Sequence, residues 1–260
     1  MTDQVKTNSV NSERLSVVAL FSGGASGVRY LLEKSRQDAN YRITAGLADS
    51  EDCSGINTLD QHGVPVEVVK KRDLNNGESD SRYFGRVAES VKEYDPDLIL
   101  LSGFMKIVKE PLLSRFEDQI INVHPADLRI EENGKRKYRG TDTVRRTISS
   151  GAREIRSTVH LVTRGVDEGP ILVVSEPVRI NRRLVRTFEE FDRDMVRSYA
   201  DILQEWMKWA CDGPAIKRAI ELIATGKVNI DGNDVSFEGK NPSKSSYYDL
   251  EKEDFVPLRA

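Results

Sequence analysis

The residues best suited to chemistry lie in the stretch INVHPADL, residues 121–128. An apolar run ends there in Asn122 and His124, in a chain that has only three histidines. Alternation along a strand points both side chains to the same face, separated by Val123. Asn122 can donate an amide N–H to a developing oxyanion, and His124 can transfer a proton near neutral pH. The alternative is a histidine that merely bonds a backbone carbonyl at a strand end, and the sequence alone leaves both interpretations open.

Two further titratable residues follow in the chain. Asp167 lies in the turn TRGVDEGPIL, where a carboxylate is commonly an exposed turn former. If it faces a histidine instead, the same carboxylate raises the pKa of that histidine and fixes its orientation, as acid–base catalysis requires. His160, in STVH, comes seven residues earlier, and alternation does not decide whether it faces the core or a site.

The glycine-rich stretch FSGGASG, residues 21–27, is a fourth candidate because it follows the first apolar run and opens a helical pattern. Glycines at such a turn let backbone N–H groups approach an anion at a helix N-terminus, where the helix dipole favours negative charge. A tight strand-to-helix turn without a ligand is the alternative. The spacing matches neither GxGxxG nor the P-loop, which argues against a dinucleotide or a nucleoside triphosphate.

Alternating strand and helix patterns must position these residues. Apolar runs predict strands at 15–21, 41–49, 64–69 and 97–104, and helices are expected at 26–36, 54–63 and 81–94. This order predicts an α/β fold with a doubly wound, mostly parallel sheet and helices on both faces. Such sheets bind ligands beyond the carboxyl ends of their strands, which is where Asn122 and His124 lie.

The pattern changes after residue 124. We expect a charged loop at 129–142, a helix at 143–151, strands at 157–163 and 170–180, one long helix over about 187–210, a helix at 213–226 and a hairpin at 227–237. The chain therefore divides into a disordered leader at 1–14, a main domain at 15–210, and an extension at 211–260. The extension consists of a small helix, a hairpin and a tail that lies on the surface.

Composition excludes several classes of function. Hydrophobic residues make up 38% and charged residues 31% of the chain, which is typical of a soluble globular protein. The formal net charge of −3 gives no electrostatic footprint for nucleic acid, and no apolar run approaches the roughly 20 residues that span a bilayer. The polar N-terminus lacks the apolar segment of a secretion signal. Cys53 and Cys211 lie far apart and indicate neither a disulfide framework nor a metal cluster. We therefore expect a cytoplasmic protein without nucleic-acid or membrane partners and without a metal.

Five stretches occur together in an order that resembles the folate-dependent formyltransferases, most closely the glycinamide ribonucleotide transformylase branch. They are VVALFSGGASG, PDLILLSGFMKIV, INVHPADL, STVHLVT and VDEGPIL. The resemblance covers about residues 15–180, with a weaker continuation to about 210, and implies a Rossmann-like formyltransferase domain. It implies transfer of a formyl group from 10-formyltetrahydrofolate to the amine of glycinamide ribonucleotide in de novo purine synthesis. Direct attack through a tetrahedral intermediate needs no metal. The partners are then small molecules, and a homodimer is left open.

The resemblance also assigns catalytic roles. It implies that Asn122 holds the oxyanion of the intermediate and that His124 stabilises charge and assists proton transfer. It implies that Asp167 orients His124 and an ordered water, while His160 is a supporting residue.

The same resemblance predicts the substrate-binding residues. The pterin of the folate is assigned to Phe104, Met105, Lys106, Ile107 and Val108, with Lys106 near its glutamate or benzoyl end. The substrate phosphate is assigned to Gly23, Gly24, Ala25, Ser26, Gly27 and Arg82. A family glutamate that reads ribose hydroxyls has its nearest counterpart in Asp194.

Departures from the family pattern leave the acceptor open. The family commonly has Gly-Asn-Gly-Ser-Asn at the glycine turn, and both asparagines are absent from residues 23–27. Another phosphorylated amine or an amino sugar is therefore an alternative acceptor. Methionyl-tRNA formyltransferase is less favoured, because residues 211–260 hold seven Lys or Arg against nine Asp or Glu. A formyltetrahydrofolate hydrolase usually carries an additional domain in front, and a non-catalytic binding module would not need the complete catalytic trio.

Overall fold

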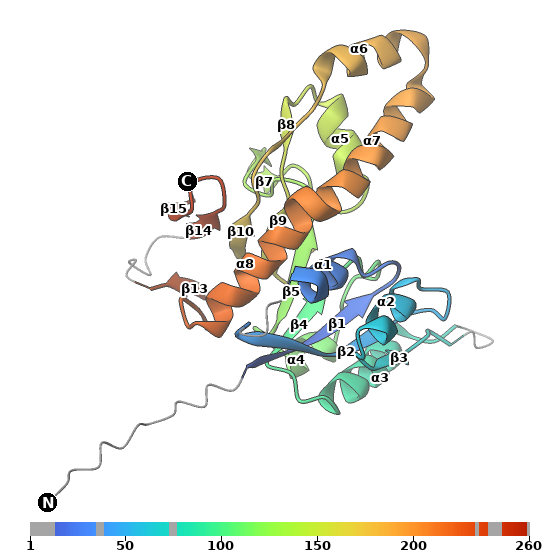
Figure 1. Ribbon diagram of the computed structural model, residues 1–260, viewed down its shortest axis with the longest axis vertical. Coiled ribbons are helices and arrows are strands. Elements are labelled where there is room, and N and C mark those ends of the chain that lie inside the picture. Colours follow the sequence, from blue (N-terminus) through green and yellow to red (C-terminus); the bar gives the residue numbers. More distant parts are fainter. Residues whose placement is uncertain (1–13, 35–38, 73–76, 232–233, 239–245, 259–260) are drawn as a thin grey trace, which may run out of the picture.

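A mostly parallel sheet forms the centre of the computed structural model, which describes residues 14–34, 39–72, 77–231, 234–238 and 246–258 (Figure 1). Its strand order is β15-β14-β10-β9-β5-β4-β1-β2-β3. The strands are β1 (Leu15–Phe21), β2 (Tyr41–Ala48), β3 (Val66–Val68), β4 (Leu98–Leu101), β5 (Ile120–His124), β9 (Thr158–Leu161), β10 (Ile171–Val174), β14 (Ser246–Asp249) and β15 (Asp254–Pro257). The five strands from β3 to β5 are parallel, and β9 pairs antiparallel with both of its neighbours. The predicted fold class is confirmed, with an antiparallel region added beyond β5.

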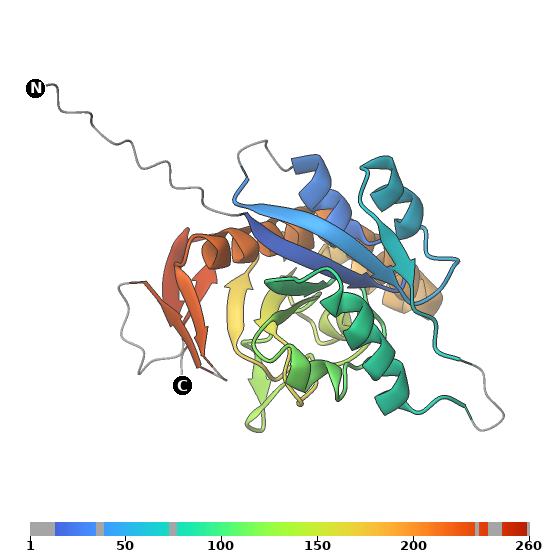
Figure 2. The same cartoon turned by 90° about the horizontal axis from the view of Figure 1, so that it is seen from below.

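Helices cover both faces of this sheet because successive residues of its strands face opposite sides. From β1, Val17 and Ala19 join a core cluster with α8 (Gly213–Ala224), whereas Val18 and Leu20 join a second cluster with α3 (Asp80–Lys92). The remaining helices of the N-terminal half are α1 (Ser26–Lys34), α2 (Gly55–Gln61) and α4 (Leu112–Arg115). Figure 2 shows α1 and α2 on one side of the sheet and α3 on the other.

The loop expected at 129–142 contains a short hairpin, β6 (Glu131–Glu132) and β7 (Lys135–Arg136). Asn133 and Gly134 connect its strands, both with positive φ, as the tight turns of hairpins require. The helix expected next is α5 (Thr143–Ser149).

The prediction of one continuous strand at 170–180 is wrong. It is divided into β10 and β11 (Val178–Arg179), and β11 pairs with β8 (Glu154–Ile155) in a separate sheet. Pro177 explains the division, because a proline has no N–H with which to continue a ladder.

The single long helix expected at 187–210 is also wrong. The chain forms α6 (Arg182–Phe191) and α7 (Arg193–Met207), which project together from the body of the molecule (Figure 1). Asp192 separates them in an extended conformation, and its carboxylate accepts a hydrogen bond from the N–H of Asp194 as the N-cap of α7. A π-helical turn, η1 (Lys208–Asp212), then joins α7 directly to α8.

The C-terminal segment extends the core. The expected hairpin is present as β12 (Val228–Asp231) and β13 (Asp234–Phe237). The tail was expected to lie on the surface, but β14 and β15 add two strands to the edge of the main sheet. Burial of Tyr247 and Tyr248 explains this arrangement, since both rings are only 4% exposed. The expected leader falls almost entirely in residues 1–13, outside the described residues. Across the described part of the chain, no helix has the length and apolar character to cross a bilayer.

Candidate active site

The carboxyl end of β5 brings the predicted catalytic side chains together. Asn122 lies opposite His160 in the pairing of β5 with β9, and its Nδ2 is 3.3 Å from Nε2 of His160. His124 and His160 both contact Asp167, which comes from the turn between β9 and β10. His160 therefore faces the site, a question that alternation alone left open.

The two histidines have defined ring orientations. Nε2 of His124 lies 2.6 Å from the carbonyl oxygen of Tyr138, and Nδ1 of His160 lies 2.7 Å from that of Leu161. A carbonyl only accepts hydrogen bonds, so these two nitrogens carry the protons in the neutral rings. The opposite nitrogens face Asp167: Nδ1 of His124 is 3.5 Å from Oδ2, and Nε2 of His160 is 3.4 Å from Oδ1.

Backbone contacts hold Asp167 between the two rings. Its φ of 54° lies in the left-handed region, and its Oδ2 accepts a hydrogen bond of 2.8 Å from the N–H of Gly140. Arg136 in β7 donates from one guanidinium nitrogen to the carbonyls of Asp167 and Gly169, at 2.7 and 2.8 Å. The turn is thereby fixed by residues of the preceding loop, which compensates for its strained backbone.

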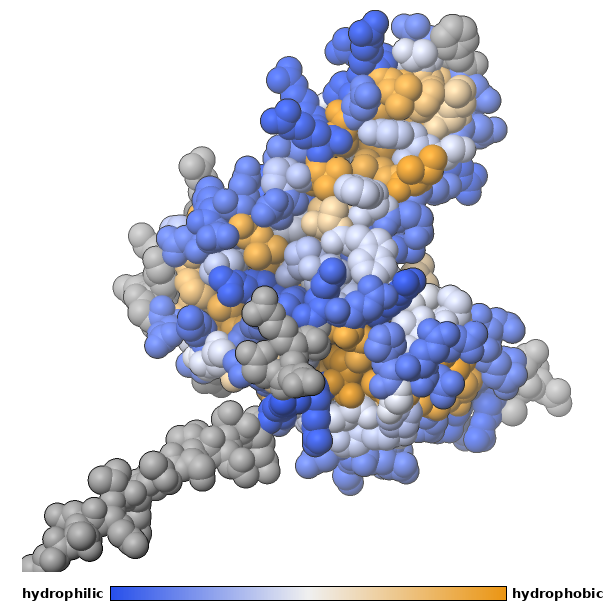
Figure 3. Space-filling view, viewed as in Figure 1, coloured by the Kyte–Doolittle hydropathy of each residue, from blue (hydrophilic) through white to orange (hydrophobic). Residues whose placement is uncertain are grey.

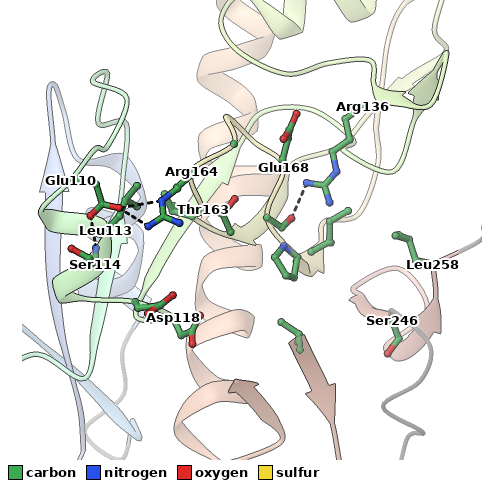
Figure 4. A pocket seen from close by; sticks show the side chains of 17 residues that line it. Glu110, Leu113, Ser114, Asp118, Arg136, Thr163, Arg164, Glu168, Ser246 and Leu258 are labelled. Atoms are coloured by element: carbon green, nitrogen blue, oxygen red, sulfur yellow. Dashed lines mark hydrogen bonds and ion pairs between the residues drawn. The ribbon is translucent and has the colours of Figure 1, made fainter. Parts of the chain in front are cut away.

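Arg136 and residues of the same turn also line a second, separate cavity of about 620 Å³, which Figure 4 shows. Arg164 also lines that cavity, where it forms an ion pair with Glu110 at 3.0 Å. The two arginines have different surroundings: Arg136 is partly buried against the carbonyls, and the side chain of Arg164 is 85% exposed.

Burial and charge determine the protonation of the pair. Burial lowers the pKa of His124, because a charged imidazolium loses its hydration, while the nearby charge of Asp167 acts in the opposite direction. Burial by itself would raise the pKa of Asp167. The contact with His160, the charge of His124 and the Gly140 N–H outweigh that effect and lower the pKa of Asp167 to about 2. At neutral pH an ionised carboxylate therefore faces His124, whose neutral form burial favours.

A cavity of about 300 Å³ opens above these residues, within the range of small-molecule sites. Its walls include the predicted folate-binding residues Phe104, Met105, Lys106, Ile107 and Val108. Met105 and Ile107 are 72% and 59% exposed, which leaves apolar surface at the opening. The ammonium of Lys106 forms an ion pair with Asp49 at the end of β2, so its position near the glutamate or benzoyl end stays a prediction.

The residues of the glycine-rich turn have different structural roles. Ser26 and Gly27 line the cavity, and the N–H of Gly27 donates to Oγ of Ser102 at 3.1 Å. A Cβ at Gly27 would lie 2.5 Å from Cδ1 of Ile216, whereas Gly23 has open space around it. No hydrogen bond from the N–H groups of residues 23–26 is present within the described ranges. Gly27 is thus required for packing, while Gly23, Gly24, Ala25 and Ser26 leave N–H groups free to bind an anion.

Two predicted substrate-binding residues lie away from this cavity. Arg82 is exposed on α3 and lines a different hollow, between α3 and β3. Asp194 is exposed at the start of α7, ten residues before Gln204, or about 15 Å along the helix. The structure does not bring either residue to the catalytic cluster.

The wall that α7 and η1 form beside the start of α1 was missed in the sequence. Gln204, Lys208 and Asp212 line the cavity from α7 and η1. Their spacing of four residues is the signal that could have placed them on one helical face. Asp212 accepts a hydrogen bond from Oγ of Ser157, and burial raises its pKa to about 6 against the opposing effects of that bond and of Lys208.

Matches to known proteins extend over most of the chain. The formyl transferase family model matches residues 15–191. Phosphoribosylglycinamide formyltransferase of Mycobacterium tuberculosis is 32% identical over 164 residues, which are 63% of this chain and 71% of that protein. The chloroplastic phosphoribosylglycinamide formyltransferase of Arabidopsis thaliana is 29% identical over 81% of this chain and 73% of that protein. The chain also matches a trifunctional purine biosynthetic protein of Drosophila melanogaster at 27% identity, of which it spans only 12%.

Solved structures share the fold. Phosphoribosylglycinamide formyltransferase of Coxiella burnetii superposes with a TM-score of 0.70 at 22% identity, covering 92% of this chain and all of that one. A formyltetrahydrofolate deformylase of Pseudomonas syringae gives a TM-score of 0.67 at 18% identity, covering 86% of this chain and 66% of that one. Because the family model spans most of the residues and includes Asn122, His124 and Asp167, the chain belongs to the formyl transferase family, as a folate-dependent enzyme.

Proposed function

We propose that the protein transfers the formyl group of 10-formyltetrahydrofolate to the primary amine of glycinamide ribonucleotide. The observation that carries the proposal is the placement of Asp167 between His124 and His160, beside Asn122, in a cavity of small-molecule size. The relatives named phosphoribosylglycinamide formyltransferase support the choice of this amine.

The folate binds along the segment that follows β4. Met105 and Ile107 supply exposed apolar surface for a flat heterocycle, and the backbone of residues 103–108 can pair with its polar edge. In this orientation the formyl carbon lies over the carboxyl end of β5, within reach of Asn122 and His124.

The acceptor binds at the other end of the cavity. Free N–H groups at the start of α1 bind its phosphate, supported by the helix dipole. Lys208 contributes positive charge, and Gln204 and Asp212 contact the hydroxyls of its sugar. These contacts take the place of the ones expected from Arg82 and Asp194.

Catalysis consists of positioning two reactants and stabilising the charge that forms between them. The amide of Asn122 donates to the oxyanion that develops when the amine attacks the formyl carbon. The attacking nitrogen then releases a proton, which Nδ1 of His124 accepts because its Nε2 already donates to Tyr138. The ionised Asp167 stabilises the imidazolium that results. Transfer of this proton to the departing folate nitrogen completes the exchange.

Incubation with 10-formyltetrahydrofolate and a panel of amines tests the proposal. The panel contains glycinamide ribonucleotide, glycinamide riboside without the phosphate, and phosphorylated and free amino sugars. We expect one N-formyl product per tetrahydrofolate released with glycinamide ribonucleotide, and a large loss of kcat/KM for the riboside. Turnover restricted to an amino sugar would contradict the acceptor, and release of formate without any acceptor would indicate a hydrolase that shares this fold.

A further inference from the structure

The cavity of about 620 Å³ that Figure 4 shows has no role in the proposed reaction. We name it the Arg136 cavity; its walls come from parts of 110–118 and 162–171, with Arg136, Val235, Ser246 and Leu258. Residues 162–165, at the start of the turn that carries Asp167, line both this cavity and the active-site cavity. None of the described residues that line it belongs to α6 or α7, the projecting part on which Figure 3 shows hydrophobic residues. The Arg136 cavity is large enough for a small molecule.

The guanidinium of Arg136 has an unused hydrogen-bonding edge at this cavity. Its Nη1 donates to the carbonyls of Asp167 and Gly169. Among the described residues, its Nε and Nη2 donate no hydrogen bond and the guanidinium forms no ion pair. Burial lowers the pKa of Arg136, although the charges of Glu131 and Asp167 act in the opposite direction. A partly buried cation of this kind is stabilised by an anion that accepts hydrogen bonds from its free edge.

The other charges of the cavity limit which anion can bind. The acidic side chains in its walls are Glu110, Glu117, Asp118 and Glu168. Glu110 and Glu168 form ion pairs with arginines, and Figure 4 shows Asp118 across the cavity from Arg136. One guanidinium compensates one negative charge, and the acidic side chains repel a second. The charges therefore favour a monocarboxylate over a phosphate or a dicarboxylate.

Apolar side chains suit the rest of such a ligand. Pro170, Ile171, Val235 and Leu258 line the cavity, and Figure 4 shows Leu258 on the same side of it as Arg136. An aromatic or branched body can cover these side chains, which removes apolar surface from water. The carboxylate can then accept two parallel hydrogen bonds from Nε and Nη2 of Arg136, the geometry that a guanidinium prefers.

We propose that the Arg136 cavity binds a small monocarboxylate with an apolar body, separately from the folate and the amine. The carboxylate occupies the free edge of the guanidinium, while Nη1 of the same group holds the turn that carries Asp167. One side chain thus connects the ligand to the catalytic turn. The inference does not depend on which amine is the acceptor, because binding is measured without substrates.

A ligand-observed NMR titration of the full chain with benzoate tests this site. We expect saturable binding with a Kd of about 1 mM or below, as for other ligands of this size. Benzamide, which lacks the charge, should bind at least ~10-fold more weakly, and so should terephthalate and inorganic phosphate. Saturation with 10-formyltetrahydrofolate should leave the Kd of benzoate unchanged, because the folate occupies the other cavity.

Two variants locate the bound benzoate. Ser246 lies at the start of β14 and lines the cavity, so Ser246→Glu places a carboxylate of the protein there. This variant and Arg136→Gln should each weaken benzoate binding at least ~10-fold. Ser198→Glu, at an exposed position on α7, makes the same change of charge outside the cavity and should leave Kd unchanged. Circular dichroism verifies that each variant is folded.

Three results would overturn the proposal. The first is a wild type that does not bind benzoate. The second is wild-type binding by Ser246→Glu and Arg136→Gln, which would place benzoate elsewhere. The third is displacement of benzoate by 10-formyltetrahydrofolate, which would assign it to the active-site cavity. If formyl transfer to the amine fails while the expected binding results hold, the proposed function is wrong and the carboxylate site remains.

Discussion

At the scale of single residues, the proposed catalytic cluster depends on which ring nitrogens already donate a hydrogen bond. Carbonyls of Tyr138 and Leu161 take the N–H groups of His124 and His160, so each ring presents its unprotonated nitrogen to Asp167. The orientation of Asn122 fits this arrangement, because its amide donates to that nitrogen of His160. One carboxylate thus faces two nitrogens that can accept a proton. When one of these nitrogens is protonated, the negative charge of Asp167 stabilises the imidazolium that forms.

The pH dependence of kcat/KM follows from this arrangement. His124 must be unprotonated to accept the proton of the amine, and burial lowers its pKa below the ordinary 6.5. Activity should therefore fall as the pH decreases through a value below 6.5 and reach its plateau by neutral pH. Steady-state rates between pH 4.5 and 8, with correction for ionisation of the amine, provide the measurement. An acid limb centred above pH 7 would contradict a buried neutral base.

Arg136 should influence the reaction without contacting a substrate. Substitution Arg136→Gln removes the charged donor to the carbonyls of Asp167 and Gly169, so the carboxylate loses its fixed position. We expect kcat to fall about 10- to 100-fold with a smaller change in KM, since small displacements of catalytic groups cost this much. Lys135→Gln, at the exposed neighbouring position on β7, should stay within about twofold of the wild type. Equal effects in the two variants would exclude a positioning role for Arg136.

Sequence patterns predicted the side chains of this cluster better than the groups that hold them. Asn122, His124, Asp167 and His160 stand in motifs whose residue types indicate chemistry. The Tyr138 carbonyl and the Gly140 N–H are backbone groups, which no residue type distinguishes. Arg136 lay in a stretch interpreted as a charged loop, because a two-residue strand leaves no periodicity to detect.

At the scale of elements, the positions at which helices and strands end determine which side chains line the cavity. The π-helical turn η1 inserts extra backbone between α7 and α8, and it places Lys208 and Asp212 beside the N-terminus of α1. Such turns frequently occur at functional sites. A sequence pattern of period 3.6 does not reveal this insertion, nor the break at Asp192 that turned one expected helix into two.

The close approach of α1 and α8 can be tested at Gly27. In Gly27→Ala the new Cβ would lie 2.5 Å from Ile216 and 2.8 Å from Ser102, so the two helices must separate. We expect a loss of about 1–3 kcal/mol in the free energy of unfolding, typical of overpacking. Gly23→Ala, at a position with open space, should change it by less than about 0.5 kcal/mol. Urea denaturation of both variants is the measurement, and equal stabilities would contradict the packing.

At the scale of the whole molecule, the chain is held together across long sequence distances. The pairing of β14 with β10 joins residues about 75 apart, and α8 connects the core cluster to the cavity wall. Local patterns predicted most strands and helices, but not this pairing of the tail with the sheet edge. The division at residue 210 and the cytoplasmic location stay predictions from sequence.

Global stability should depend on the ionisation of Asp212, a half-buried carboxylate in the cavity wall. Its pKa of about 6 in the folded chain exceeds 3.8, its ordinary value, so the folded state binds the proton more tightly. The free energy of unfolding therefore contains an unfavourable contribution that grows as the pH rises from about 4 to about 6. Asp212→Asn removes it, and should become more stable than the wild type by about 1–3 kcal/mol at pH 7 but not at pH 4.

Urea denaturation at both pH values tests this difference. Asp201→Asn, at an exposed position on α7, serves as the control and should show no such dependence on pH. If Asp212→Asn raised the free energy of unfolding equally at pH 4 and pH 7, the carboxylate would not titrate between these pH values.

The central claim is that His124 and Asp167 together receive the proton of the attacking amine. Its most direct test is the kcat of Asp167→Asn for formyl transfer from 10-formyltetrahydrofolate to glycinamide ribonucleotide. Asparagine keeps the shape of the side chain and removes its charge, so the imidazolium loses its counter-charge. We predict a fall in kcat of about 10²- to 10⁴-fold with KM values near those of the wild type and an unchanged circular dichroism spectrum. A kcat within about threefold of the wild type would contradict the account.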